Sequence, residues 1–207
     1  PRPERGPGGN AGDELVGAGG GQGRAADVQD LRRVVSQSGA AGKVGSVSAD
    51  LELALKLATA ADEISLAHFR TGIAFETKAD LTPVTEADRA VEVELRRILG
   101  AERPGDAILG EEQGTTGGGS RRWIVDPIDG TRNYARGVPV WATLIALEES
   151  GHVRLGVASA PALGRSWWAE RGDGAFADGN RLGVSSVARV EDAVLTFGHG
   201  VSAPGLA

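Results

Sequence analysis

The sequence predicts an α+β domain in which helices pack against a largely antiparallel sheet. Two observations predict this class. Two helical stretches with apolar faces lie between residues 50 and 100, and consecutive strand-like segments separated by turn residues follow from Val138 onward. Consecutive strands do not give the alternating βαβ order of a parallel sheet. With 207 residues, of which 41% are hydrophobic, the chain has enough apolar surface for a core.

Residues 1–49 are predicted to form a Gly-rich disordered tail, and residues 50–207 to form the folded domain. The tail has too little apolar surface to offset its ordering entropy, apart from a marginal helix expected at residues 27–35. Order is expected to begin with a helix at residues 51–70, which Ser48 or Asp50 can cap. Its apolar positions spread beyond one narrow stripe, so we expect it to be packed on more than one side.

The next elements alternate between short strands and one further helix. A strand is expected at residues 72–78, and a helix from Thr85 to about Leu99, where Gly100 ends it. Short strands are expected at residues 107–109 and 122–126, joined by a flexible loop over residues 114–120. The segments 138–148, 153–160 and 166–170 predict an antiparallel meander, and residues 175–176 and 193–197 predict further strands.

Composition excludes several function classes. The formal net charge is −6 and there is no basic stripe, which argues against a nucleic-acid partner. No run of about 18 apolar residues occurs, so we expect no membrane partner. The absence of Cys excludes disulfides, thiolate zinc sites and Cys nucleophiles. These features are consistent with a cytoplasmic location.

The most informative segment is an apolar run that ends in carboxylates. Asp126 and Asp129 flank Pro127, which is predicted to turn the chain tightly so that both carboxylates point at one spot. With Glu111 and Glu112, and with the backbone carbonyl of Ile128, they form an all-oxygen ligand set that suits Mg²⁺ or Mn²⁺. An Asx-turn explains an isolated pair of Asp residues but requires none of these extra groups.

The residues that follow are suited to a phosphate. Gly130 has no side chain where a ligand must come close, and Thr131 adds a hydroxyl where a short helix can begin. Asp88 has two readings at this point, because three residues after Thr85 it can cap a helix or serve the site. The three His residues have no metal-ligand spacing, so we expect surface or packing roles for them.

These motifs resemble the inositol monophosphatase superfamily of metal-dependent, lithium-sensitive phosphatases. The resemblance covers about residues 50–200 and is carried by the segments 83–88, 110–112 and 126–131. Further segments, at residues 77–85, 136–141 and 159–163, are most similar to the actinobacterial histidinol-phosphatase branch. The resemblance implies the layered α/β sandwich of the inositol monophosphatase and fructose-1,6-bisphosphatase type.

The resemblance also implies a role for each motif residue. It implies metal binding by Glu111, Asp126, the Ile128 carbonyl and Asp129, with two or three Mg²⁺ ions and Mn²⁺ as a substitute. Gly130 and Thr131 would present backbone N–H groups to the phosphate. The resemblance assigns the catalytic roles to Thr131, Glu111 and Asp88. Thr131 and Glu111 would orient the attacking water, and Asp88 would pair with Thr131 or hold a more weakly bound ion.

The implied activity is hydrolysis of a small phosphorylated metabolite, with L-histidinol phosphate favoured and inositol monophosphate as the alternative. After the strand expected at residues 193–197, the superfamily has a Trp-Asp motif and then a Gly-Gly motif, and neither occurs in residues 198–207. We therefore expect a domain that is incomplete at its C-terminus. A catalytically silent fragment that acts only as a structural or association domain is the competing interpretation. Related enzymes are often dimers, so a homodimer is the expected assembly.

Overall fold

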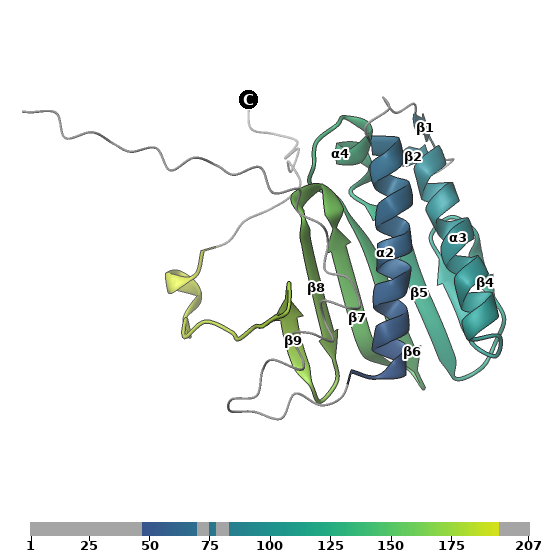
Figure 1. Ribbon diagram of the computed structural model, residues 1–207. Coiled ribbons are helices and arrows are strands. Elements are labelled where there is room, and N and C mark those ends of the chain that lie inside the picture. The colour runs from purple at the N-terminus through teal and green to yellow at the C-terminus, as the bar shows by residue number, and fades with distance from the viewer. Residues whose placement is uncertain (1–46, 70–74, 78–82, 195–207) are drawn as a thin grey trace, which may run out of the picture.

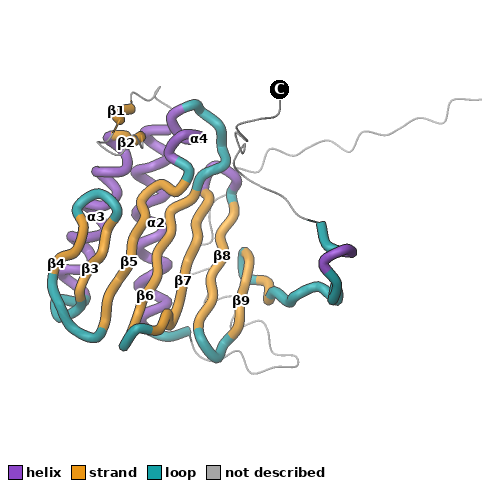
Figure 2. The backbone as a smooth tube through the Cα atoms, turned by 180° about the vertical axis from the view of Figure 1, so that it is seen from behind, coloured by secondary structure: helices purple, strands orange, loops and turns teal. Residues whose placement is uncertain are grey.

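A computed structural model describes residues 47–69, 75–77 and 83–194 of the chain. It consists of an eight-stranded sheet with two long helices, α2 (Ala49–Phe69) and α3 (Glu86–Glu102), side by side on the same face (Figures 1 and 2). The α+β class is confirmed. Most of the predicted tail, with its helix at residues 27–35, lies outside the described residues.

The long helices begin where capping residues satisfy their first backbone N–H groups. Ser48, and not Asp50, caps α2, because its Oγ accepts a hydrogen bond of 3.0 Å from the amide of Leu51. A capping box starts α3: the Thr85 side chain accepts from the Asp88 amide, and the Asp88 side chain accepts from the Thr85 amide. As predicted, α2 is packed on more than one side, against α3 and against the strands β6 (Ala142–Glu149) and β7 (His152–Ala160) of the sheet.

The large sheet is mixed. Its strand order is β10-β9-β8-β7-β6-β5-β3-β4, and every neighbouring pair is antiparallel except β3 with β5. A separate pair is formed by β1 (Phe75–Thr77) and β2 (Pro83–Thr85). The large sheet comprises β3 (Ala107–Gly110), β4 (Gly114–Thr116), β5 (Arg121–Asp129), β6 (Ala142–Glu149), β7 (His152–Ala160), β8 (Arg165–Glu170), β9 (Gly174–Ala177) and β10 (Asn180–Arg181).

The predicted meander is confirmed as β6, β7 and β8, but several boundaries were wrong. Gly100 does not end the second helix, because α3 continues to Glu102. Gly114–Thr116 is a strand and not a loop, because it pairs antiparallel with β3. Residues 138–141 precede β6 and lie outside it. Of the strand predicted at residues 193–197, the two described residues belong to no strand, and the rest lies outside the described residues.

The main core lies between the two helices and the sheet. Its largest fully buried side chains are Trp123 of β5, Leu57 of α2 and Leu95 of α3. A second, smaller cluster of buried residues contains Ile128, Tyr134 and Trp141. This cluster lies at the end of β5, beside the short helix α4 (Thr131–Ala135). The two clusters therefore anchor β5 at different points along its length.

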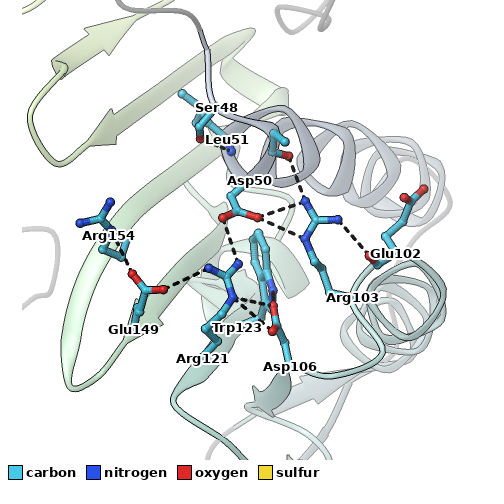
Figure 3. Close-up of polar contacts among 11 residues, drawn as sticks. Ser48, Asp50, Leu51, Glu102, Arg103, Asp106, Arg121, Trp123, Glu149 and Arg154 are labelled. Atoms are coloured by element: carbon cyan, nitrogen blue, oxygen red, sulfur yellow. Dashed lines mark hydrogen bonds and ion pairs between the residues drawn. The ribbon is translucent and has the colours of Figure 1, made fainter.

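A polar network holds the other end of β5 in place (Figure 3). The Arg121 guanidinium contacts Asp50 of α2 at 2.9 Å, Asp106 at 3.2 Å and Glu149 of β6 at 3.4 Å. The indole N–H of Trp123 donates to Asp106 at 2.9 Å. The start of β5 is thus tied both to the helix layer and to its neighbouring strand. None of the described helices is long and apolar enough to cross a membrane.

Candidate metal and phosphate site

The register of the only parallel strand pair among the described residues brings the two acidic motifs together. Gly110 of β3 is the partner of Val125 of β5, so Glu111 and Asp126 follow at adjacent points of the same sheet edge. The Glu111 amide continues the pairing by donating to the Val125 carbonyl at 3.3 Å. Two motifs separated by more than ten residues of sequence therefore converge because their strands run parallel.

Asp126 and Asp129 lie on either side of an irregularity in β5. The pairing with β6 shifts between them, since Asp126 is opposite Leu144 and Asp129 is opposite Ala142. The predicted tight turn at Pro127 was therefore wrong. Pro127 lies within the strand, where a bulge accommodates a residue that cannot donate a ladder hydrogen bond.

The carboxylates crowd around Asp126. Burial raises the pKa of Asp126 well above its usual range, and a hydrogen bond with Glu111 and the charges of Glu111, Asp129 and Asp88 raise it further. Its Oδ1 atom is buried and has no hydrogen-bond partner among the residues that the structure describes. A buried carboxylate oxygen without a partner, surrounded by other carboxylates, is what a hard divalent cation satisfies. The donor set therefore fits Mg²⁺ or Mn²⁺ in its chemistry.

The arrangement does not yet amount to a closed coordination shell. Within the described part of the chain, no group of three or more His, Asp or Glu side chains is placed to hold one metal ion as it stands. Glu111 and Asp129 are exposed, so their side chains have room to rotate toward Asp126. Ion binding is thus expected to draw these carboxylates together.

Thr131 connects the acidic strand end to α3. Its hydroxyl lies 2.9 Å from the Ile128 carbonyl and 3.4 Å from Asp88 Oδ1. The backbone turns between them at Gly130, whose φ of 89° lies in the left-handed region, and α4 begins at Thr131 as expected. Four of the predicted site residues thus lie around one short turn, namely Ile128, Gly130, Thr131 and Asp88, whereas Glu111 approaches Asp126 from the β3–β4 connection.

Asp88 caps α3, as one of its two readings predicted, and it also lies beside the Thr131 hydroxyl, while its role in the site stays a prediction. One oxygen, Oδ2, accepts from the Thr85 amide at 2.8 Å, and the other lies near the Thr131 hydroxyl. The side chain is only 1% exposed. Burial raises the pKa of Asp88, the bonds from Thr85 oppose that rise, and the charge of Glu111 adds to it. The helix cap therefore orients a carboxylate toward the Thr131 turn.

The turn at Gly130 gives a stability prediction. A Cβ at Gly130 would lie 3.1 Å from the Val140 carbonyl oxygen, whereas a Cβ at Gly137, also left-handed with a φ of 73°, would meet nothing within 4 Å. Gly137→Ala is expected to cost about 1 kcal/mol for the backbone conformation alone, and Gly130→Ala about 1 kcal/mol more because of the contact. Urea unfolding of both variants checks this, and equal losses would contradict it.

A series of buried polar side chains from α2, β7 and β6 leads to the bulge of β5 at Pro127. Asp62 of α2, 6% exposed, accepts a bond of 2.7 Å from Ser159 of β7, and Ser159 is the cross-strand partner of Thr143. The Thr143 hydroxyl donates to the Pro127 carbonyl at 2.8 Å. The pKa of Asp62 is raised to about 7, chiefly by burial and also by the charge of Glu63, against the opposing hydrogen bond from Ser159. The folded state is therefore most stable when the Asp62 carboxyl is protonated and neutral.

This burial predicts a specific pH dependence of stability. Between about pH 4 and 7, folded Asp62 keeps a proton that the unfolded chain has lost, so the free energy of unfolding falls as pH rises. The loss is complete above pH 7 and corresponds to about 1.4 kcal/mol per unit of pKa shift. Asp62→Asn should therefore gain stability relative to wild type between pH 5 and pH 8.

Urea unfolding in the presence of EDTA at these two pH values measures the difference. The exposed Asp192→Asn provides the control and should keep the same offset from wild type at both values. A constant difference between Asp62→Asn and wild type would show that the Asp62 carboxyl titrates normally.

Glu92 is not among the residues that the sequence motifs predicted. It is fully buried on α3, and it accepts hydrogen bonds from the amides of Glu112 and Gln113. The available signal was the spacing of Asp88, Glu92 and Arg96, which places three charged residues at successive i,i+4 positions along one side of a helix. That stripe borders the apolar face, where a solvated run of charges is not expected.

Comparison with known proteins agrees with this arrangement. A model of the inositol monophosphatase family matches residues 47–206. The chain is 57% identical over 166 residues to a histidinol-phosphatase of Mycobacterium tuberculosis, covering 76% of this chain and 64% of the relative. It is 50% identical over 158 residues to a histidinol-phosphatase of Streptomyces coelicolor, covering 72% and 59%.

A solved structure also has a similar fold. The crystal structure of the extragenic suppressor protein suhB from Bartonella henselae matches with a TM-score of 0.65 and 33% identity, over 69% of this chain and 57% of that one. The chain thus spans 64% and 59% of the length of the two curated relatives. Because the family model covers most of the described fold and the acidic motifs converge in it, the chain belongs to the inositol monophosphatase family.

Proposed function

We propose that the protein is a Mg²⁺-dependent phosphomonoesterase with L-histidinol phosphate as its favoured substrate. The single observation that carries the reaction class is the convergence of Glu111, Asp126 and Asp129 beside the Thr131 turn. The family is generally metal-dependent, which supports the same class. The substrate rests on the identity of 57% to a histidinol-phosphatase over 76% of the chain.

The metal would be held by oxygen atoms of four residues, namely the carboxylates of Glu111, Asp126 and Asp129 and the backbone carbonyl of Ile128. Bound Mg²⁺ supplies two things to such a reaction: it lowers the pKa of a water molecule, and it neutralises charge on the phosphate. Mn²⁺ is expected to substitute because it prefers the same oxygen ligands. The family resemblance implies two or three ions at such a site.

The chain's own groups would orient the reactants. Glu111 and the Thr131 hydroxyl would orient the attacking water, and Asp88 would fix the rotamer of Thr131 through the contact of 3.4 Å. The backbone N–H groups of Gly130 and Thr131 precede the first hydrogen-bonded turn of α4. They would therefore be available to donate to phosphate oxygens. The αL conformation of Gly130 brings these donors to the same end of the strand as the carboxylates.

Phosphate release tests this proposal. The full chain should release phosphate from L-histidinol phosphate in the presence of Mg²⁺, and release should stop with EDTA and return when Mg²⁺ is added in excess. Inositol monophosphate is the comparison substrate and should show a lower kcat/KM. Circular dichroism establishes that the protein is folded under the assay conditions.

A folded protein that hydrolyses neither substrate at saturating Mg²⁺ would contradict the enzymatic proposal. It would favour a silent domain with a structural or association role. A higher kcat/KM for inositol monophosphate would leave the reaction class intact and correct the substrate.

A further inference from the structure

A fully buried carboxylate with no role in the proposed chemistry lies on α3, one turn beyond Asp88. The Glu92 side chain is 0% exposed. Glu is almost never fully buried unless its charge has partners. Its partners are backbone groups: the Glu112 amide donates to Oε2 at 2.7 Å and the Gln113 amide donates to Oε1 at 3.0 Å. Glu92 is therefore bonded to the turn that carries Glu111.

That turn joins β3 to β4. Gly110 and Gly114 form the last cross-strand pair, and residues 111–113 make the connection. On one side, the Glu111 amide is held by the Val125 carbonyl of β5 at 3.3 Å. On the other side, Glu92 holds the next two amides. The backbone is thus held on both sides of the Glu111 side chain.

The position of Glu92 explains on steric grounds why residue 110 is a glycine. A Cβ built on Gly110 would lie 2.1 Å from Oε1 of Glu92, far closer than two non-bonded atoms can approach. Any other residue at this position would push the carboxylate away from the turn amides. The glycine before Glu111 therefore leaves room for the buried carboxylate.

Arg96 completes the unit. Its Nε donates to Glu92 Oε1 at 2.8 Å, and its other nitrogens donate to the Gly114 carbonyl at 2.6 Å and to the Thr116 hydroxyl at 2.8 Å. One guanidinium thus neutralises the buried carboxylate and also binds the second strand of the hairpin. Such compensation is needed because an unpaired charge beside Glu111 and Asp126 would add to their repulsion.

We propose that Glu92 is a positioning residue that sets the metal affinity of Glu111 by holding the backbone of the 111–113 turn. This inference rests on the proposed function, which makes Glu111 a metal ligand. Glu92 does not contact the ion or the substrate. Its effect comes from presenting Glu111 beside Asp126 without a reorganisation of the hairpin on binding.

The test measures ion binding directly. The Kd for Mn²⁺ is obtained from the electron paramagnetic resonance signal of the free ion in titrations of the full chain without substrate. Glu92→Gln removes the charge, and Glu92→Asp keeps it but withdraws the oxygens from the turn amides. Both are expected to weaken Mn²⁺ binding about 10- to 100-fold.

Glu94→Gln and Glu94→Asp are the matched controls. Glu94 lies on the same helix and also pairs with an arginine, Arg97, but on the exposed side. Both controls should bind Mn²⁺ as wild type does. If wild type binds and folded Glu92 variants bind equally well, the positioning role is overturned while the proposed function stands. If wild type binds no Mn²⁺, both proposals fail.

Amide hydrogen exchange in the wild-type protein keeps the test independent of variant folding. The amide protons of Glu112 and Gln113 should be protected from exchange before any metal is added, because Glu92 accepts both. Exchange of these two protons at the rate of an unstructured peptide would overturn the proposal even if no Glu92 variant folds.

Discussion

Asp129→Asn is expected to lower Mg²⁺-dependent phosphate release by more than about 100-fold, because it removes a negative charge from the proposed metal site without changing the size of the side chain. Asp129 is exposed at the end of β5, and its charge acts on the half-buried Asp126. The substitution therefore removes a proposed ligand while leaving the core untouched. The variant should therefore lose activity but remain folded.

The measurement separates these two kinds of loss. Phosphate release is followed as a function of Mg²⁺ concentration, and the free energy of unfolding is measured on the same sample. Asp173→Asn is the control, since Asp173 is an exposed Asp in the loop between β8 and β9. It should keep the activity and the Mg²⁺ requirement of wild type. Wild-type release by Asp129→Asn at ordinary Mg²⁺ would show that the metal site lies elsewhere.

The convergence of the acidic residues could be predicted only in part from the sequence. Oxygen ligands in two motifs indicated a hard metal, and the Gly130-Thr131 pair indicated a turn into a short helix. The closeness of Glu111 to Asp126 depends on the parallel pairing of β3 with β5, in which Gly110 meets Val125. Local patterns say nothing about which strand pairs with which. The family resemblance implied only that both motifs serve one metal site, and the strand pairing that joins them comes from the structure.

Other features escaped prediction for physical reasons that act over a distance. Gly114–Thr116 has a loop-like composition, but pairing with β3 makes it a strand. Pro127 predicted a turn, yet a register shift against β6 accommodates it inside β5. Glu92 was hidden because its partners are backbone amides twenty and twenty-one residues away. In each case tertiary contacts overrode a local preference.

Several buried polar groups in and near the candidate site lower the stability of the fold. Asp126 has a buried oxygen without a partner, Asp62 is buried as an acid, and Glu92 needs Arg96 to be tolerated. Burying each of these polar or charged groups costs free energy. The apolar core between the helices and the sheet must offset their cost. The strength of that core therefore determines whether the acidic strand end can be held in place.

Trp123→Ala is expected to have the largest effect on stability. Trp123 is 0% exposed near the start of β5, where its cross-strand partners are Ile108 and Leu147. Truncation leaves a large cavity and removes the bond from the indole N–H to Asp106. Substitutions of this kind cost about 3–5 kcal/mol, a large share of the roughly 5–15 kcal/mol that stabilises a typical domain.

Trp167→Ala is the matched control, because strand alternation places Trp167 of β8 on the sheet face opposite the helices and leaves it half-buried. Its cost should be less than half that of Trp123→Ala in urea unfolding monitored by circular dichroism. Equal costs would show that the core does not lie where the helices cover the sheet. Trp123 and Asp126 both lie on β5. The Trp123→Ala molecules that remain folded should therefore also bind Mn²⁺ more weakly than wild type does. Trp167→Ala should bind it as wild type does.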